Sequence, residues 1–182
     1  DDYACFIAAS VEVAELNTDS VYLVTMPISH NFPLGAPGAF GTLACGARLV
    51  LAMSPNPEIA FPLIERERVT ITAQVPAVTI QWLESPSRDK YDLSSLRMLQ
   101  VGGSRLPAEV AQRVKPLLGA TVQQVYGMAE GLVNATRLDD PDEVLFNSQG
   151  RPISTADEIR IVDWNGSAAA AGEPGELLTR GP

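Results

Sequence analysis

The sequence alternates short apolar runs with amphipathic segments over its first two thirds, and this alternation constrains the fold more than any other feature. Predicted strands lie at 21–26, 48–53, 69–73, 96–101 and 121–125, and predicted helices at 3–16, 34–45, 57–68, 76–84 and 107–118. Strands that are apolar along their whole length are typical of a parallel sheet covered on both faces. The sequence therefore predicts an α/β fold with a mostly parallel sheet flanked by helices.

The last part of the chain has a different sequence pattern. Beyond about residue 136 the strand–helix alternation stops, and the segments 158–164 and 176–180 are predicted to be strands of an antiparallel pair. We expect them to form part of a small antiparallel β-barrel layer. We place a domain boundary near residue 148, with an α/β subdomain at 1–148 and the start of a barrel-like subdomain at 149–182.

Composition and charge exclude several classes of function. The net charge of −9 argues against a general nucleic-acid or anionic-membrane surface, which needs clustered Lys and Arg. No apolar run reaches the roughly 18 residues of a membrane span, so we expect a soluble protein. Cys5 and Cys45 lie in apolar stretches, which predicts buried free thiols in a reducing, cytoplasmic location. A single histidine, His30, excludes a multi-histidine metal site.

Polar and small residues follow the predicted strands, where open α/β sheets bind their ligands. They are His30, Asn31, Gln74, Pro76, Gly102, Gly103, Ser104, Tyr126, Gly127 and Glu130. Each also has an ordinary structural explanation, such as a tight turn at the glycine pair. The sequence has neither a GxxxxGK[ST] phosphate loop, nor a GxGxxG fingerprint, nor a GxSxG elbow. From the residues alone, this rim is a candidate nucleotide or small-acid site.

Six segments together carry a resemblance to a known family. They are PISHNFPL at 27–34, FPLIERE at 61–67, LQVGG at 99–103, QQVYGMAEGLVN at 123–134, TRLDDP at 136–141 and GELLTRGP at 175–182. In this order they resemble the aryl acid AMP ligases of the acyl-adenylate-forming superfamily, typified by 2,3-dihydroxybenzoate-AMP ligase. The chain looks like a central fragment of the N-terminal domain of such an enzyme.

The resemblance implies an activity. Such enzymes join an aryl carboxylate to ATP with the help of Mg²⁺, giving an aryl-AMP and pyrophosphate. They then pass the aryl group to the phosphopantetheine thiol of a carrier protein, in siderophore or peptide natural-product biosynthesis. An aryl-CoA ligase of the same superfamily and a non-catalytic ligand-binding α/β module stay open as alternatives.

The resemblance also implies roles for individual residues. His30 and Glu130 would take part in catalysis, with Glu130 associated with Mg²⁺. The implied substrate-binding residues are His30, Asn31, Phe32, Ala36, Gly102, Ser104, Ala129 and Val133. The implied nucleotide-binding residues are Gly102, Gly103, Ser104, Gln124, Val125, Tyr126, Gly127 and Met128. Tyr126 would stack on the adenine.

The sequence departs from the family pattern in two ways. The family's phosphate loop, ribose-binding Asp and catalytic Lys are not in these 182 residues, so we expect the chain alone to be inactive in adenylation. Phe32 and Ala36 stand where dihydroxybenzoate enzymes carry Tyr and Ser, which predicts a preference for salicylate. Ser104 stands where the family usually has Ala, and it leaves an anthranilate-like or 3-hydroxypicolinate-like acid open.

Overall fold

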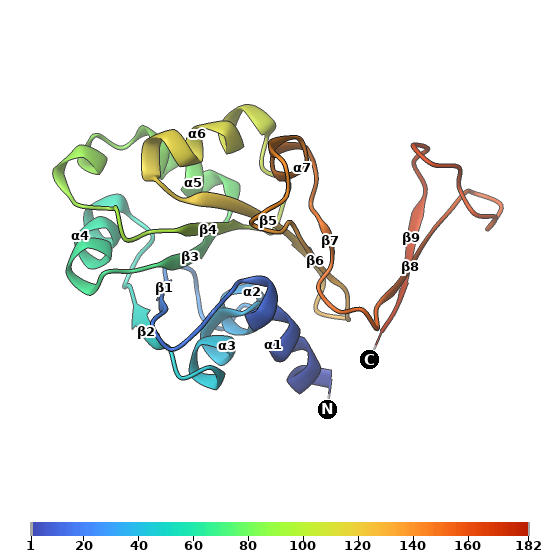
Figure 1. The fold of residues 1–182 in the computed structure, drawn as a ribbon. Helices are drawn as coiled ribbons and strands as arrows, with labels where there is room; N and C mark the ends of the chain where they lie inside the picture. Colours follow the sequence, from blue (N-terminus) through green and yellow to red (C-terminus); the bar gives the residue numbers. More distant parts are fainter. Residues whose placement is uncertain (1, 182) are drawn as a thin grey trace.

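The computed structural model describes residues 2–181 and has a seven-stranded sheet at its centre (Figure 1). The strand order is β2-β1-β3-β4-β5-β6-β7, and the first five strands are parallel whereas β6 and β7 are antiparallel to their neighbours. The strands are β1 (Val21–Val24), β2 (Arg48–Leu51), β3 (Ile71–Gln74), β4 (Met98–Val101), β5 (Thr121–Gly127), β6 (Val133–Ala135) and β7 (Arg151–Pro152). The predicted α/β fold with a mostly parallel sheet is confirmed.

Helices cover both faces of this sheet (Figure 1). One layer consists of α1 (Asp2–Val13), α2 (Asn31–Gly35) and α3 (Gly38–Ala44). The other layer consists of α4 (Pro57–Glu67), α5 (Pro76–Glu84), the 3₁₀ turn η1 (Pro86–Lys90), α6 (Ala108–Leu118) and α7 (Asp142–Asn147). None of the helices in residues 2–181 is long and apolar enough to cross a membrane.

The two faces of β1 show how the strands divide their side chains between the layers. Val21 and Leu23 pack in the core under α4, α5 and α6, whereas Tyr22 and Val24 pack against the α1 and α3 side. Successive side chains of a strand point to opposite faces of the sheet. A strand of four apolar residues therefore has to be covered by helices on both faces. This is why the apolar runs of the sequence are continuous rather than alternating.

Local signals fix the ends of the helices. Asn56 caps α4 by accepting a hydrogen bond from the Glu58 N–H at 2.9 Å, and Pro57 occupies the first turn. Gly119 ends α6 with a φ of 75°, a conformation that glycine adopts without strain. The turn at Gly119 sets the direction in which the chain enters β5, the strand that forms one wall of the pocket.

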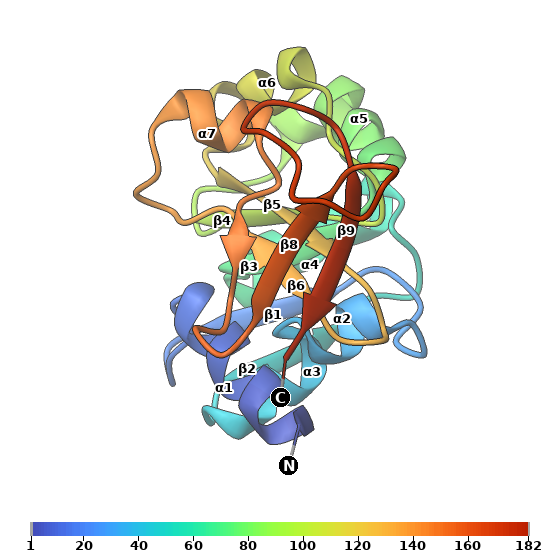
Figure 2. The same ribbon diagram turned by 90° about the vertical axis from the view of Figure 1, so that its right-hand side faces the viewer.

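A separate antiparallel pair of strands, β8 (Glu158–Val162) and β9 (Glu176–Arg180), follows the main sheet. Figure 2 shows this hairpin in front of the main sheet, and Figure 1 shows that it projects away from it. Arg180 pairs with Glu158 across the two strands. The antiparallel end of the chain is confirmed. Its closure into a barrel and the boundary near residue 148 stay predictions; β7, at 151–152, still belongs to the main sheet.

Two expectations on local structure were wrong, and three short elements were missed. The helix predicted over 34–45 is two short helices, α2 and α3, because Pro37 cannot donate the hydrogen bond that would continue α2. The short elements β6, α7 and β7 were not predicted. Both thiols are free, but Cys5 is exposed because it lies on the solvent-facing side of α1, and Cys45 is only half-buried because it caps the end of α3.

Candidate functional site

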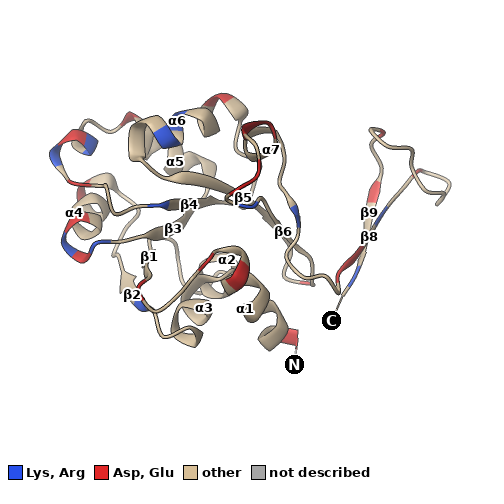
Figure 3. Cartoon of the chain, in the orientation of Figure 1, with Lys and Arg blue, Asp and Glu red and all other residues tan. Residues whose placement is uncertain are grey.

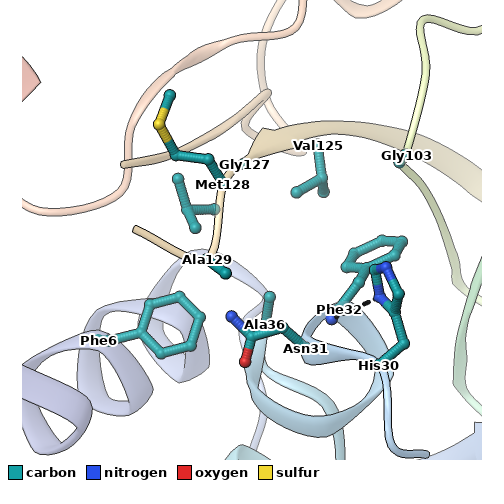
Figure 4. Close-up of a pocket in the computed structure, with 12 residues that line it drawn as sticks. Phe6, His30, Asn31, Phe32, Ala36, Gly103, Val125, Gly127, Met128 and Ala129 are labelled. Carbon is teal, nitrogen blue, oxygen red and sulfur yellow. Dashed lines mark hydrogen bonds between the residues drawn. The ribbon is translucent and has the colours of Figure 1, made fainter. Parts of the chain in front are cut away.

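A pocket of about 200 Å³ lies at the carboxyl edge of β4 and β5, beside α2 (Figure 4). Its lining comes from α1, from the segment 30–36, from the turn after β4, and from β5 and the loop that follows. The lining residues are Phe6, His30, Asn31, Phe32, Ala36, Gly102, Gly103, Val125, Gly127, Met128, Ala129 and Val133. The residues that follow the predicted strands therefore do lie around a cavity, and its lining segments are as far apart in sequence as Phe6 and Val133.

The imidazole ring of His30 caps the N-terminus of α2. The residue is the N-cap of that helix, and its Nδ1 accepts a hydrogen bond from the Phe32 N–H at 3.2 Å. When the neutral ring accepts at Nδ1, its proton is on Nε2. The side chain is exposed, so Nε2–H is free to donate to a ligand at the mouth of the pocket.

Asn31 is tied to the first helix. The Tyr3 hydroxyl donates to Asn31 Oδ1 at 3.0 Å, and the Tyr3 ring meets Phe6 and Phe40 edge-on, with centroids 6.1 and 6.3 Å away. Figure 4 shows the Asn31 nitrogen on the side of Ala129 and its oxygen turned away from it. The amide nitrogen of Asn31 is therefore the group left for a ligand.

The rest of the lining is apolar and tight. Phe6 and Phe32 pack against Val125 and Val133, so aromatic and branched side chains line the same cavity. Gly102 is buried, and a Cβ on it would meet the ring of Phe32 at 3.0 Å. Such a slot suits a flat ring that is polar at one edge.

A second pocket, of about 210 Å³, adjoins the first. Phe6, Asn31, Met128, Ala129 and Val133 line both, and the second adds Asp2, Tyr3, Glu130 and Gly131. It is the more polar of the two; Figure 3 shows the acidic residue at the start of α1 beside the N-terminus. Residues 2–181 hold no cluster of three or more His, Cys, Asp or Glu side chains that would cage a metal.

The structure brings most of the predicted site residues together. Eleven of them line the first pocket: His30, Asn31, Phe32, Ala36, Gly102, Gly103, Val125, Gly127, Met128, Ala129 and Val133. Glu130 is exposed and lines the second pocket. Ser104 and Tyr126 line neither of the two pockets; Ser104 is exposed and Tyr126 is half-buried opposite Asn134 of β6.

Gln124 does not line the pocket either, because its side chain is used inside the fold. The buried amide accepts from the Leu106 N–H at 3.2 Å and donates to the carbonyls of Leu145 and Phe146 at 3.0 and 3.2 Å. It thereby joins the segment before α6 to α7 behind β5. Successive residues of a strand face opposite sides, and Val125 is the one that faces the pocket.

Phe6 and Tyr3 are the site residues that sequence reasoning missed. They lie on one face of α1 at i and i+3, and this spacing was the available signal. Nothing in the sequence indicated that α1 would pack beside the segment 30–36, since the two are joined through a strand.

A charged cluster supports the β6 side of the pocket. Arg137 donates to the carbonyls of Ala135 and Pro152, and burial holds the pKa of its guanidinium below the usual value. Burial raises the pKa of Asp140, but hydrogen bonds from the Arg137 N–H and from Arg151 outweigh it, so the pKa of this carboxyl is lowered. The cluster holds β6 and β7 together, and β6 carries Val133 of the pocket.

Comparison with known proteins gives a consistent result. The family model described as "AMP-binding enzyme" matches residues 3–182. The chain is 54% identical over 182 residues to 2,3-dihydroxybenzoate-AMP ligase of Bacillus subtilis, covering all of this chain and 34% of that protein. It is 50% identical to the salicyl-AMP ligase / salicyl-S-ArCP synthetase of Mycobacterium tuberculosis, covering all of this chain and 32% of that protein.

A solved structure shows the same fold. The apo structure of MbtA from Mycobacterium smegmatis superposes with a TM-score of 0.91 at 48% identity, covering 99% of this chain and 33% of that one. The chain thus spans about one third of the length of the proteins that it matches.

Proposed function

This chain belongs to the AMP-binding enzyme family, and we propose that it is the part of an aryl acid adenylating enzyme that holds the aryl acid and one side of the nucleotide. The observation that carries the proposal is the pocket itself. It combines an apolar slot between Phe32, Val125 and Val133 with two N–H donors at its mouth, on His30 and Asn31. The names and about 50% identity of the two curated relatives support the same reading.

In the proposed reaction a carboxylate oxygen of the acid attacks the α-phosphorus of ATP. The new C–O–P linkage forms as the bond to pyrophosphate breaks, which gives aryl-AMP and pyrophosphate. A thiol sulfur then attacks the aryl carbonyl, loses its proton and expels AMP. The first step brings two anions together, the carboxylate and the triphosphate, so positioning and charge stabilisation supply most of the rate.

Different residues of the chain would contact the acid and the nucleotide. The Nε2–H of His30 would donate to the carboxylate or phosphate oxygens, and the turn at Gly102 and Gly103 would let the backbone approach the ring and the nucleoside. Gly127 and Met128 would border the nucleotide, with Ser104 and Tyr126 at its outer edge. The side chain of Gln124 is hydrogen-bonded inside the fold, so it would not contact the nucleotide.

Mg²⁺ would offset the charge of the phosphates, and Glu130 is the residue of this chain proposed to hold it. The fit rests on exposure and position: Glu130 lies in the second pocket, next to the slot proposed for the acid. One carboxylate suffices, because Mg²⁺ in nucleotide sites takes most of its oxygen ligands from phosphates and water.

The test is aryl-acid-dependent ATP–pyrophosphate exchange by the full-length enzyme, with an aliphatic acid as control. Exchange with 2-hydroxybenzoate or 2,3-dihydroxybenzoate supports adenylation, and its absence favours a non-catalytic binding module. Mass spectrometry with a phosphopantetheinylated carrier protein or with free CoA as acceptor then separates the proposed carrier-protein ligase from an aryl-CoA ligase. We place this enzyme in the cytoplasm, in siderophore or peptide natural-product synthesis, where ATP and carrier proteins meet.

A further inference from the structure

We propose that Tyr3 is a positioning residue that fixes the Asn31 amide with its N–H group towards the pocket, so that the site selects acids with an ortho acceptor over acids with an ortho donor. The inference rests on the proposed function, because it concerns the aryl acid that the same pocket would take. It assigns a role in specificity to Tyr3 of α1, which does not follow a predicted strand and was not among the predicted site residues.

The Asn31 amide has one acceptor and one donor end, and the contact with Tyr3 uses the acceptor. The Tyr3 O–H donates to Oδ1 at 3.0 Å, which leaves the Nδ2 hydrogens for the pocket. A phenol is a better donor than acceptor, because its ring withdraws electron density from the oxygen. The reverse arrangement, with Nδ2–H donating to the phenol, is therefore the weaker one.

Tyr3 is held in place although 53% of its surface is exposed. Its ring meets Phe6 and Phe40 edge-on at 6.1 and 6.3 Å, the arrangement that aromatic pairs prefer. Phe6 lines the pocket and belongs to the same helix as Tyr3, so the hydroxyl and the apolar wall of the site are part of one element.

The second polar side chain of the pocket is a donor as well. His30 accepts at Nδ1 from the Phe32 N–H, so its free nitrogen carries a hydrogen. No other side chain in the lining carries an oxygen or a nitrogen. The side chains of the pocket thus offer two N–H donors and no free oxygen acceptor, which suits a ligand with two neighbouring acceptors.

An ortho-hydroxy aryl acid has this arrangement. Its O–H donates to the adjacent carboxylate, which leaves a lone pair of the hydroxyl oxygen facing outwards, where the Asn31 N–H can donate to it. An ortho-amino aryl acid donates one N–H of its amino group to its own carboxylate and points the second N–H outwards. That second N–H would face the N–H of Asn31, and two donors in a desolvated pocket leave both unpaired.

The experiment uses the full-length enzyme and the variant Tyr3→Phe, which removes only the hydroxyl and keeps the ring contacts with Phe6 and Phe40. The readout is the ratio of kcat/KM for 2-hydroxybenzoate and 2-aminobenzoate in ATP–pyrophosphate exchange. We expect the preference for the hydroxy acid to fall on the order of tenfold, the worth of one buried hydrogen bond. Tyr91→Phe, at a half-buried tyrosine outside both pockets, is the matched control and should leave the ratio unchanged.

A double-mutant cycle shows whether Tyr3 acts through Asn31. In the Asn31→Ala background, Tyr3→Phe should have no further effect on the ratio. An unchanged ratio in Tyr3→Phe alone, or an equal change in the Asn31→Ala background, overturns the inference. Isothermal titration calorimetry without ATP measures the ratio of the affinities for the two acids independently of turnover. If the enzyme shows no exchange, the proposed function is contradicted, but the effect of Tyr3→Phe on this affinity ratio can still be measured.

Discussion

A Cβ atom on Gly102 would lie 3.0 Å from Cε1 of the Phe32 ring. The same atom would lie 3.0 Å from the carbonyl oxygen of Val125, so it would meet neighbours on two sides. Both distances are shorter than ordinary van der Waals contact between such atoms. The absence of a side chain at position 102 therefore sets the width of the slot between β4 and α2.

Gly102→Ala should narrow the proposed acid site more than the nucleotide site. The added methyl group has to displace the Phe32 ring, which lines the pocket. We expect the KM for the aryl acid to rise by about tenfold or more, with a smaller effect on the KM for ATP. Gly102→Ala combined with Phe32→Leu should restore part of the affinity, and equal KM values in wild type and Gly102→Ala would contradict this account of the slot.

Glu130→Gln should lower the rate of adenylation on the order of 10²-fold, by analogy with the loss of a preorganised electrostatic partner. The exposed carboxylate lies in the second pocket, beside the proposed acid site. The measurement is the rate of exchange as a function of Mg²⁺ concentration. Glu109→Gln, at the exposed start of α6, serves as the control. If Glu130→Gln matches wild type at every Mg²⁺ concentration, Glu130 has no part in holding the metal.

The sequence predicted the sheet and the edge that carries the pocket because both depend on short-range patterns. Runs such as 21–26 and 96–101 are apolar throughout, and His30 and Gly102 follow them directly. Parallel strands bring their carboxyl ends to one edge of the sheet, so residues far apart in sequence meet there without any knowledge of loop conformation.

The contacts that sequence reasoning missed depend on packing between elements. The place of Phe6 and Tyr3 in the site follows from how α1 lies against α2, and no local pattern encodes that. The burial of Gln124 depends on α7, a six-residue helix too short to give a clear periodic signal. Strand β6 has only three residues, so its pairing with β5 was hidden for the same reason.

Gln124→Met should destabilise the fold without changing the shape of the pocket directly. The substitution keeps the volume but leaves the Leu106 N–H and the carbonyls of Leu145 and Phe146 without their partner. We expect the free energy of unfolding to fall by about 2–4 kcal/mol, since each buried group left unpaired costs roughly 1–3 kcal/mol. Gln112→Met, on the exposed side of α6, is the matched control. Equal melting temperatures for both variants would show that the Gln124 contacts contribute little.

Tyr22→Phe tests an alkaline pH dependence. The Tyr22 side chain is fully buried in β1, its hydroxyl has no hydrogen-bond partner among the described residues, and burial raises the pKa of this phenol above its ordinary value of 10.0. Above pH 10 the unfolded chain loses the proton and the folded chain keeps it. The free energy of unfolding therefore falls as the pH rises through this range.

The variant should be at least as stable as wild type at pH 7, by up to about 1 kcal/mol, because an unpaired buried hydroxyl is removed. Its melting temperature should also fall less steeply between pH 9 and pH 11. Circular dichroism at a series of pH values measures both effects, with Tyr91→Phe as the control that keeps Tyr22. An equal or steeper fall in Tyr22→Phe than in wild type would contradict a raised pKa of the Tyr22 phenol in the folded protein.

The preference among hydroxylated acids should depend on Phe32 and Ala36. Both line the pocket, and neither side chain offers a hydroxyl to a ligand. A 3-hydroxyl on the ring would be buried against this apolar wall without a partner, which costs roughly 1–3 kcal/mol. We therefore expect the full-length enzyme to prefer 2-hydroxybenzoate over 2,3-dihydroxybenzoate by about 10- to 100-fold in kcat/KM.

The double variant Phe32→Tyr, Ala36→Ser adds two hydroxyls to the same wall and should shift that ratio towards 2,3-dihydroxybenzoate. Gly102 leaves little space beside Phe32, so the single variant Ala36→Ser separates the effect of a new hydrogen bond from that of crowding. A wild-type enzyme that already prefers 2,3-dihydroxybenzoate, or a double variant with an unchanged ratio, would show that the 3-position of the ring lies elsewhere. The ring would then have to be turned in the slot, with its 3-position towards Met128 and Ala129, which line both pockets.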